Sequence, residues 1–304
     1  MSGKRMASFF DEIAKNRLKS IILMAIFIVF FAAIVYAFVW VFGGGLVGFS
    51  IGILIILFYA VIVYFYGDKM TLKVAGAKEA DKTTYASLYS TVEGLSAATQ
   101  VPTPKVYIVN DPNPNAFATG RNKKVSAIAV TSGLLTTMNH RELQGVIAHE
   151  MSHIADNDVQ FMMIAIVFAG AIGLIAAVLR MSLFFGGFRR VEGEGGIIIL
   201  LIALAVGILA PIFALLIRLA ISRKREYMAD ANGARLTRDP EGLADALTKI
   251  KNYTAQPNVK GVKNANEVNG SMYFSNPFKG KSIMNIFSTH PPIDERINRL
   301  KKMY

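Results

Sequence analysis

The sequence predicts an α+β membrane protein that is mostly helical, with a small β-sheet and four transmembrane helices. Four long apolar runs are the first observation, and hydrophobic residues make up 53% of the chain against 18% for charged residues. The second observation is that amphipathic helical segments and two short β-branched segments lie outside these runs. A chain of 304 residues is long enough for one soluble core and a few spans.

The first two apolar runs cover residues 20–42 and 46–66, with Gly43-Gly44-Gly45 between them. At 1.5 Å per residue the first would reach roughly 30–35 Å, enough to cross the hydrocarbon core. The turn is uncharged and both outer flanks are basic, so the positive-inside rule predicts cytoplasmic flanks. The first run is too long for a cleavable signal peptide, and a second span follows it directly.

The second pair of runs covers residues 159–185 and 197–221 around a Gly-rich loop. A basic flank after the fourth run again marks the cytoplasmic side. Arg189 and Arg190 lie in what should be the outer loop, which weakens this orientation. The second hairpin therefore either spans the membrane or lies shallow and packed on the protein.

The net charge of +12 has two explanations, a nucleic acid partner or a membrane surface. The basic residues lie largely beside the apolar runs, which favours anionic lipid headgroups and predicts the bilayer as a partner, without nucleic acid. A small transporter is disfavoured because no span centre carries a charged pair. The absence of cysteine excludes disulfides and thiolate metal ligands, and fits a reducing compartment.

The segments outside the runs carry ordinary helix and strand signals. Apolar spacing predicts an amphipathic helix over residues 79–99, which Pro102 and Pro104 end. The remaining expected elements are strands at Lys105–Val109 and Lys124–Thr131, helices starting near Arg141, at Asp239 and at Pro292, and a mobile loop over residues 255–282.

The sequence His149-Glu150-Met151-Ser152-His153 has the spacing H-E-x-x-H. On a helix, positions i and i+4 share one face with Cβ atoms about 5–6 Å apart, so the two imidazoles can share one tetrahedral zinc. Glu150 is placed to reach a metal-bound water rather than the metal. The alternative is a polar helix with chance histidines, but apolar neighbours indicate burial, which would be costly for unpartnered groups.

A catalytic zinc needs a third protein ligand and an open position. Glu226 is the candidate, and Asp230 lies on the same helix face at i+4. Asp230 would accept a hydrogen bond from a ligand histidine, His149, and so fix its tautomer. The alternative is a surface helix on which Glu226 pairs with Arg223 or Arg225.

Four ordered motifs resemble the HtpX-type heat-shock membrane metalloproteases, which are related to the CAAX prenyl proteases. They are residues 115–120, 149–153, 225–230 and 288–297, and the resemblance covers nearly the whole chain. It implies a gluzincin-like catalytic domain, one zinc per chain, and proteolysis in membrane protein quality control. It also implies Glu226 as third ligand. Related prenyl proteases usually have more than four spans, which argues against that subgroup.

The chain then divides into five parts. Residues 1–19 are a basic arm, either an amphipathic surface helix or a solvated flank. The others are a transmembrane hairpin over 20–66, the first part of the catalytic domain over 67–158, a second hairpin over 159–221, and the rest of the catalytic domain over 222–304.

Further residues are expected around the zinc. His290 either stabilises the oxyanion or is structural, with Arg296 and Tyr227 as weaker candidates for the oxyanion. Substrate is expected to add as a strand to an edge strand at Lys124–Thr131. The expected substrate-binding residues are Asn115, Ala116, Phe117 and Thr119 in the first motif and Ala127, Ile128 and Ala129 in the strand.

These observations predict an integral-membrane zinc endopeptidase that cleaves misfolded or unfolded segments of membrane and cytosolic proteins. It would lie in the inner (plasma) membrane, with the catalytic domain facing the cytoplasm. The alternatives are a CAAX-type prenyl protease and a membrane-anchored scaffold with a structural zinc site. Glu150 favours catalysis, because a closed structural site needs no carboxylate beside the metal. The oligomeric state stays open.

Overall fold

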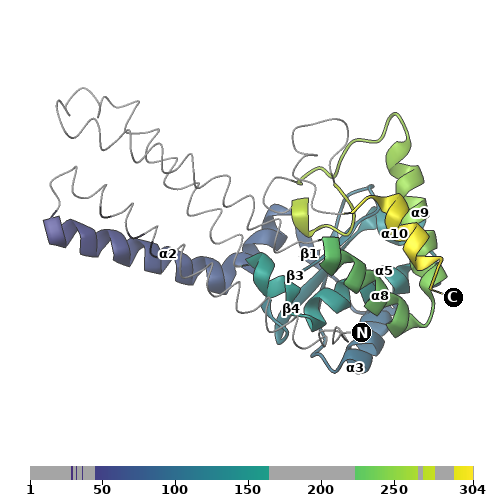
Figure 1. The fold of residues 1–304 in the computed structure, drawn as a ribbon, viewed down its shortest axis with the longest axis horizontal. Helices are drawn as coiled ribbons and strands as arrows, with labels where there is room; N and C mark the ends of the chain where they lie inside the picture. The colour runs from purple at the N-terminus through teal and green to yellow at the C-terminus, as the bar shows by residue number, and fades with distance from the viewer. Residues whose placement is uncertain are drawn as a thin grey trace, which may run out of the picture. The chain divides into compact units, whose positions relative to one another are not determined.

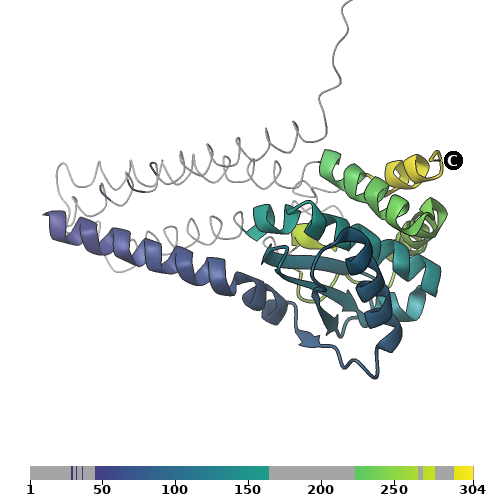
Figure 2. The same cartoon turned by 90° about the horizontal axis from the view of Figure 1, so that it is seen from below.

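The structure, a computed structural model, describes residues 45–163, 223–265, 270–277 and 291–303, with isolated helical positions 29, 32 and 36. The chain forms two compact units, residues 1–60 with 171–210 and residues 61–170 with 211–304. All site residues discussed below lie in the second unit, whose helices and sheet are seen from two sides in Figures 1 and 2.

Three of the four expected spans fall largely or wholly outside the described residues. These are residues 20–42, 159–185 and 197–221, and the basic arm 1–19 lies outside as well. Among the described residues, one helix is long and apolar enough to cross a membrane, at Phe49–Val74. It belongs to α2 (Gly45–Val74), which continues two turns beyond the apolar run that ends at residue 66.

The sheet has four strands in the order β1-β2-β4-β3. They are β1 (Ala77–Glu79), β2 (Lys105–Val109), β3 (Ala116–Asn122) and β4 (Val125–Thr131). β2 and β4 are parallel, and the other two pairs are antiparallel. The two strands expected from β-branched residues are therefore present as neighbours, and β1 and β3 are strands that the sequence did not indicate.

The expectation that Lys124–Thr131 is an edge strand is wrong. Its strand, β4, pairs with β2 on one side and with β3 on the other. Both rows of backbone groups are thus used within the sheet, and no added strand can pair there. Ala127, Ile128 and Ala129 are buried as part of the core. The edge next to β4 is β3, and this edge is the one near the site helix described below.

Helices pack around the sheet, and three of the described helices begin at a capping side chain. α3 (Ala86–Thr99) begins seven residues later than expected, because residues 77–79 form β1 and the Asp81 carboxylate accepts hydrogen bonds in a turn before it. The other described helices are α4 (Ser132–Thr137), α5 (His140–Ala155), α8 (Arg223–Thr237), α9 (Pro240–Ala255) and α10 (Ile293–Leu300), with the short 3-10 turn η2 (Gly270–Met272).

The start of α5 is fixed by a capping box. The Asn139 side chain accepts from the Glu142 amide, and the Glu142 carboxylate accepts from the Asn139 amide. Lys249 of α9 donates to the same carboxylate at 2.7 Å and neutralises its buried charge. The first turn of the site helix is therefore held from two sides.

Residues 270–277, which lie within the mobile loop expected over 255–282, pack against the start of β3. Asn115 Oδ1 accepts from the Ser275 amide and Asn115 Nδ2 donates to the Ser275 carbonyl. The Phe274 amide donates to the Ala116 carbonyl at 2.7 Å. Tyr273 and Phe274 are fully buried. Residues 266–269 and 278–282 lie outside the described residues.

Candidate active site

Helix α5 carries the two histidines and the glutamate of the H-E-x-x-H segment. His149 and Glu150 are buried, and the His153 side chain is 16% exposed. The ring centroids of His149 and His153 are 4.7 Å apart, and their Nε2 atoms are 3.1 Å apart. The i, i+4 spacing thus places both ring nitrogens at one point beside the helix.

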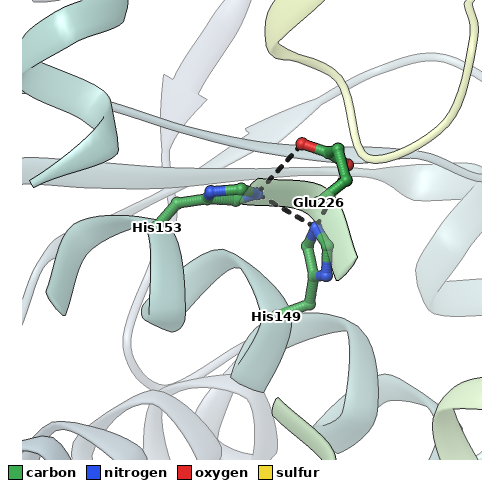
Figure 3. Close-up of side chains that lie close together, drawn as sticks. All are labelled: His149, His153 and Glu226. Carbon is green, nitrogen blue, oxygen red and sulfur yellow. Dashed lines mark hydrogen bonds and ion pairs between the residues drawn. The ribbon is translucent and has the colours of Figure 1, made fainter. Parts of the chain in front are cut away.

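Glu226 reaches the same point from the first turn of α8. Its Oε1 lies 3.4 Å from His153 Nε2 and its Oε2 lies 3.8 Å from His149 Nε2. Figure 3 shows the two rings and the carboxylate pointing toward one another. Gly233 allows α8 to approach α5 this closely, because a Cβ at that position would lie 3.0 Å from the His149 backbone nitrogen.

This donor set fits a metal ion. One ligand atom from each of His149, His153 and Glu226 lies within 4.8 Å of the others. Two imidazoles and a carboxylate are ligands that Zn²⁺ takes in catalytic sites, where three protein ligands leave a fourth position open. All three side chains are buried or nearly so, and such a cluster of nitrogen and carboxylate donors is costly to bury without a cation.

A carboxylate and an arginine hold the first histidine. Asp230 Oδ1 lies 2.9 Å from His149 Nδ1, so Nδ1 carries the proton and Nε2 keeps its lone pair for a metal. Arg296 of α10 donates to both oxygens of Asp230, at 2.9 and 2.7 Å. It also donates to the Phe274 carbonyl and lies over the Phe274 ring. All of these side chains are buried.

The second histidine has a matching pair of partners. Asp158 Oδ2 lies 3.0 Å from His153 Nδ1, and Arg225 donates to Asp158 Oδ1 at 2.8 Å. The Arg225 guanidinium also lies over the Phe161 ring. Asn157 has a positive φ of 61° just after the end of α5, and this turn brings Asp158 back to the histidine. Both histidines are therefore oriented in the same way, by an Asp that an Arg holds.

Glu150 points toward the sheet with one oxygen unused. Its carboxylate accepts a hydrogen bond from the Ala118 amide of β3, and its Oε1 has no hydrogen-bond partner among the described residues. Burial raises the pKa of Glu150 to about 7. A buried carboxylate with a free acceptor next to a cluster of metal ligands is what a general base for a metal-bound water requires.

Without a bound metal, the pKa values of the two histidines shift in opposite directions. Burial lowers the pKa of His149 to about 4, although the hydrogen bond with Asp230 opposes this. Burial also disfavours charge on His153, but its hydrogen bond to Asp158 and the Glu226 charge raise its pKa to about 9. Burial works against ionisation of Asp230, but the Arg296 charge lowers the pKa of that carboxyl to about 2. The Asp230–Arg296 pair is therefore ionised at neutral pH.

The structure brings some of the sequence candidates together and not others. Arg296 is bound to Asp230 instead of being free for an oxyanion. The Tyr227 hydroxyl donates to Glu295, and Arg299 covers its ring. The Asn115 side chain is fully used in holding Ser275. His290 lies outside the described residues.

The remaining members of the expected substrate set are buried in the sheet. Ala116 and Phe117 begin β3, and Phe117 packs on the Tyr273 ring at 5.0 Å. Thr119 is also buried, and its hydroxyl has no partner among the described residues. Their side chains are therefore core residues, and only the backbone of β3 can meet another chain.

Two functional residues had weaker sequence signals. Asp158 follows the helix that carries His153 by three residues, a position where an acidic residue is usually solvated. Arg296 shares the apolar face of α10 with Ile293, Ile297 and Leu300, and a charge on a buried face requires a buried partner. That second signal could have led to Asp230.

Comparisons with known proteins agree with this geometry. The profile described as peptidase family M48 matches residues 82–304. A protein named protease HtpX homolog from Caldanaerobacter subterraneus subsp. tengcongensis is 46% identical, over 95% of this chain and 96% of that protein. A protein of the same name from Dictyoglomus turgidum is 44% identical, over 97% of this chain and 95% of that protein.

A solved structure has a similar fold. The crystal structure of S. mikatae Ste24p matches with a TM-score of 0.52 and 19% identity, covering 94% of this chain and 67% of that one. The expected family resemblance is thus confirmed by the profile and by relatives aligned over nearly the full length. With a His–His–Glu cluster that could hold a metal and a helix long enough to span a membrane, the chain belongs to peptidase family M48, as a membrane metalloprotease.

Proposed function

We propose that this chain is a zinc endopeptidase with His149, His153 and Glu226 as ligands and Glu150 as general base. The observation that carries the proposal is the unpartnered Glu150 Oε1 beside the three converging ligands. A closed structural zinc site has no use for such a group, which argues against the scaffold alternative.

Each residue of the site has a separate proposed role. Bound zinc would lower the pKa of a water molecule and polarise the scissile carbonyl. Glu150 takes the proton from the attacking water and passes it to the leaving amine. Asp230 and Asp158 keep the Nδ1 protons of the two histidines in place, so that both Nε2 lone pairs face the metal. His290 is proposed to stabilise the oxyanion.

Substrate is proposed to bind as an extended strand along the outer edge of β3. The Thr131 amide of β4 donates to the Asn115 carbonyl, and the Asn115 amide donates to the Thr131 hydroxyl. Alternation along the antiparallel pair therefore turns the backbone groups of residues 116, 118 and 120 away from β4. The Ala116 carbonyl accepts from the Phe274 amide, and the Ala118 amide donates to Glu150. Of these outward groups, the Ala118 carbonyl and the backbone groups of Gly120 are left for a substrate strand.

Such an edge selects conformation more than sequence. Backbone pairing needs an extended segment and makes few demands on side chains. Unfolded or misfolded segments of membrane and cytosolic proteins are therefore the proposed substrates, in a role of protein quality control. The proposed location is the inner (plasma) membrane with the catalytic unit in the cytoplasm, which follows from the basic flanks of the apolar runs.

The test uses the full chain in lipid nanodiscs with unfolded casein as substrate. We expect internal cleavage products by mass spectrometry, loss of cleavage after chelation, and recovery on adding one equivalent of zinc. A farnesylated C-terminal peptide serves as a second substrate. Cleavage that resists full zinc removal would refute the zinc mechanism. Stoichiometric zinc without cleavage would favour the scaffold, and cleavage of only the farnesylated peptide would favour a prenyl protease.

A further inference from the structure

The turn between β3 and β4 touches the helix that can cross the membrane. Arg121, at the end of β3, donates from Nη1 to the Phe65 carbonyl of α2 at 3.1 Å. Its guanidinium also lies 5.0 Å from the centre of the Phe65 ring. Both residues belong to the same compact unit, so this contact fixes the turn along the length of the helix.

The helix itself shows at which depth the turn lies. Up to Phe65 and Tyr66, α2 exposes large apolar side chains, including Phe58, Val61 and Ile62. The first charged residues, Asp68 and Lys69, follow within one turn, and Lys69 lies over the Tyr66 ring. Aromatic residues followed by charges mark the headgroup level of a spanning helix. A group bound to Phe65 therefore lies at that level.

The turn is basic. Strand β3, the turn and strand β4 carry Arg121, Lys123 and Lys124 and no acidic residue. Asn122 shapes the turn by accepting from the amides of Lys124 and Val125, both at 2.9 Å. Lys124 is exposed. Asp156, just after the end of α5, interacts electrostatically with Lys123.

We propose that the turn Arg121–Lys124 docks on the anionic lipid headgroups of the leaflet from which α2 emerges. The occupant is a lipid surface because the contact with Phe65 fixes the turn at the depth where headgroups lie, and a basic turn at that depth complements their charge. Docking would hold the outer edge of β3 at the membrane surface. The position and charge of the turn do not depend on whether β3 binds substrate.

The absence of cysteine allows single labels without background. Lys124→Cys carries a fluorophore at the turn, and Lys302→Cys carries it near the C-terminus, just after α10. The full chain is placed in nanodiscs of phosphatidylcholine alone or with 30% phosphatidylglycerol, each with a headgroup nitroxide quencher. We expect quenching at position 124 to be at least two-fold stronger with the anionic lipid, to weaken in high salt, and to be absent at position 302.

A charge variant sharpens the test. In Lys124→Cys, the added changes Arg121→Gln and Lys123→Gln should return the quenching to its level in phosphatidylcholine, with the zinc content unchanged as evidence of folding. Equal quenching at positions 124 and 302, or quenching that ignores the anionic lipid, would overturn the proposal. Loss of quenching with millimolar inorganic phosphate at constant ionic strength would also overturn it, in favour of a free-anion site. If the quenching at position 124 responds to added polyglutamate but not to the anionic lipid, the proposal is overturned in favour of an acidic polypeptide as the partner.

Discussion

Each histidine of the site is held by an aspartate that is itself bound by an arginine, but the two sets lie in different surroundings. His149 is held by Asp230 and Arg296, which are buried and come from α8 and α10. His153 is held by Asp158, just after the end of α5, and by Arg225, in the first turn of α8, whose side chains are 13% and 11% exposed. The two pairs join residues at nearly the same separation in the sequence, 66 and 67 positions, and they differ in burial: the first is buried, whereas the second lies at the rim of the site.

The two pairs differ in burial, and the pKa of each histidine reflects the balance between desolvation and the neighbouring charges. Around His149, desolvation dominates and the ring stays neutral, with its pKa lowered to about 4. Around His153, desolvation also opposes charge, but the hydrogen bond to Asp158 and the Glu226 charge outweigh it and raise the pKa to about 9. The buried pair should therefore matter for folding and metal binding together, and the rim pair mainly for metal binding.

Removing Glu226, the proposed metal ligand that lies beside both histidines, should have the largest effect. Glu226→Ala leaves two imidazoles for the metal, and we expect zinc affinity to fall by more than about 100-fold, beyond the loss of an orienting partner. Activity should disappear with the metal. Zinc competition with a fluorescent chelator measures this, and Glu241→Ala, an exposed glutamate in α9, is the control. Zinc affinity equal to that of the parent would place the third ligand elsewhere.

Breaking the buried pair should affect two quantities at once. Asp230→Ala leaves Arg296 buried without its counter-charge, which destabilises the fold by about 3–5 kcal/mol. Zinc affinity should fall about 10–100-fold as His149 loses its orientation. Denaturant unfolding of the metal-free protein separates the two effects. Arg296→Met, which removes the other member, should also destabilise the fold; if both variants unfold like the parent, the pair has no structural role.

Breaking the rim pair should affect mainly the metal. Asp158→Asn keeps the side-chain volume but removes the negative charge that accepts hydrogen bonds from His153 Nδ1 and from Arg225. We therefore expect zinc binding to be about ten-fold weaker. The loss of stability should be about 1–3 kcal/mol, smaller than for Asp230. Asp156→Asn is the matched control, because Asp156 bonds Asn232 and not a histidine. Equal zinc affinities in the two variants would remove Asp158 from the site.

Local signals in the sequence predicted much of this unit. The H-E-x-x-H spacing located α5, and Asp239-Pro240 located the start of α9. β2 and β4 followed from β-branched residues. Apolar spacing predicts that Tyr85, Leu88, Val92, Leu95 and Ala98 share one face of the helix over residues 79–99. The structure buries Leu88, Val92 and Leu95, leaves Tyr85 half-buried and Ala98 exposed, and starts the helix later than expected.

The neighbours of each strand could not be predicted, because strand order depends on contacts distant in sequence. β3 contains Gly120 and three polar or charged residues besides, a composition with weak strand preference, so its place at the edge went unnoticed. β4 was consequently mistaken for the edge. Asp158 was missed because its approach to His153 depends on a left-handed residue, Asn157, that no helix periodicity indicates.

The central claim is that Glu150 moves a proton while His149, His153 and Glu226 hold the metal. The most direct measurement is zinc content and casein cleavage on one preparation of Glu150→Gln in the full chain. We predict one zinc per chain with affinity close to that of the parent, and cleavage slowed by about 10²–10⁴-fold, because only the general base is lost. Cleavage at the parental rate with zinc bound would contradict the mechanism.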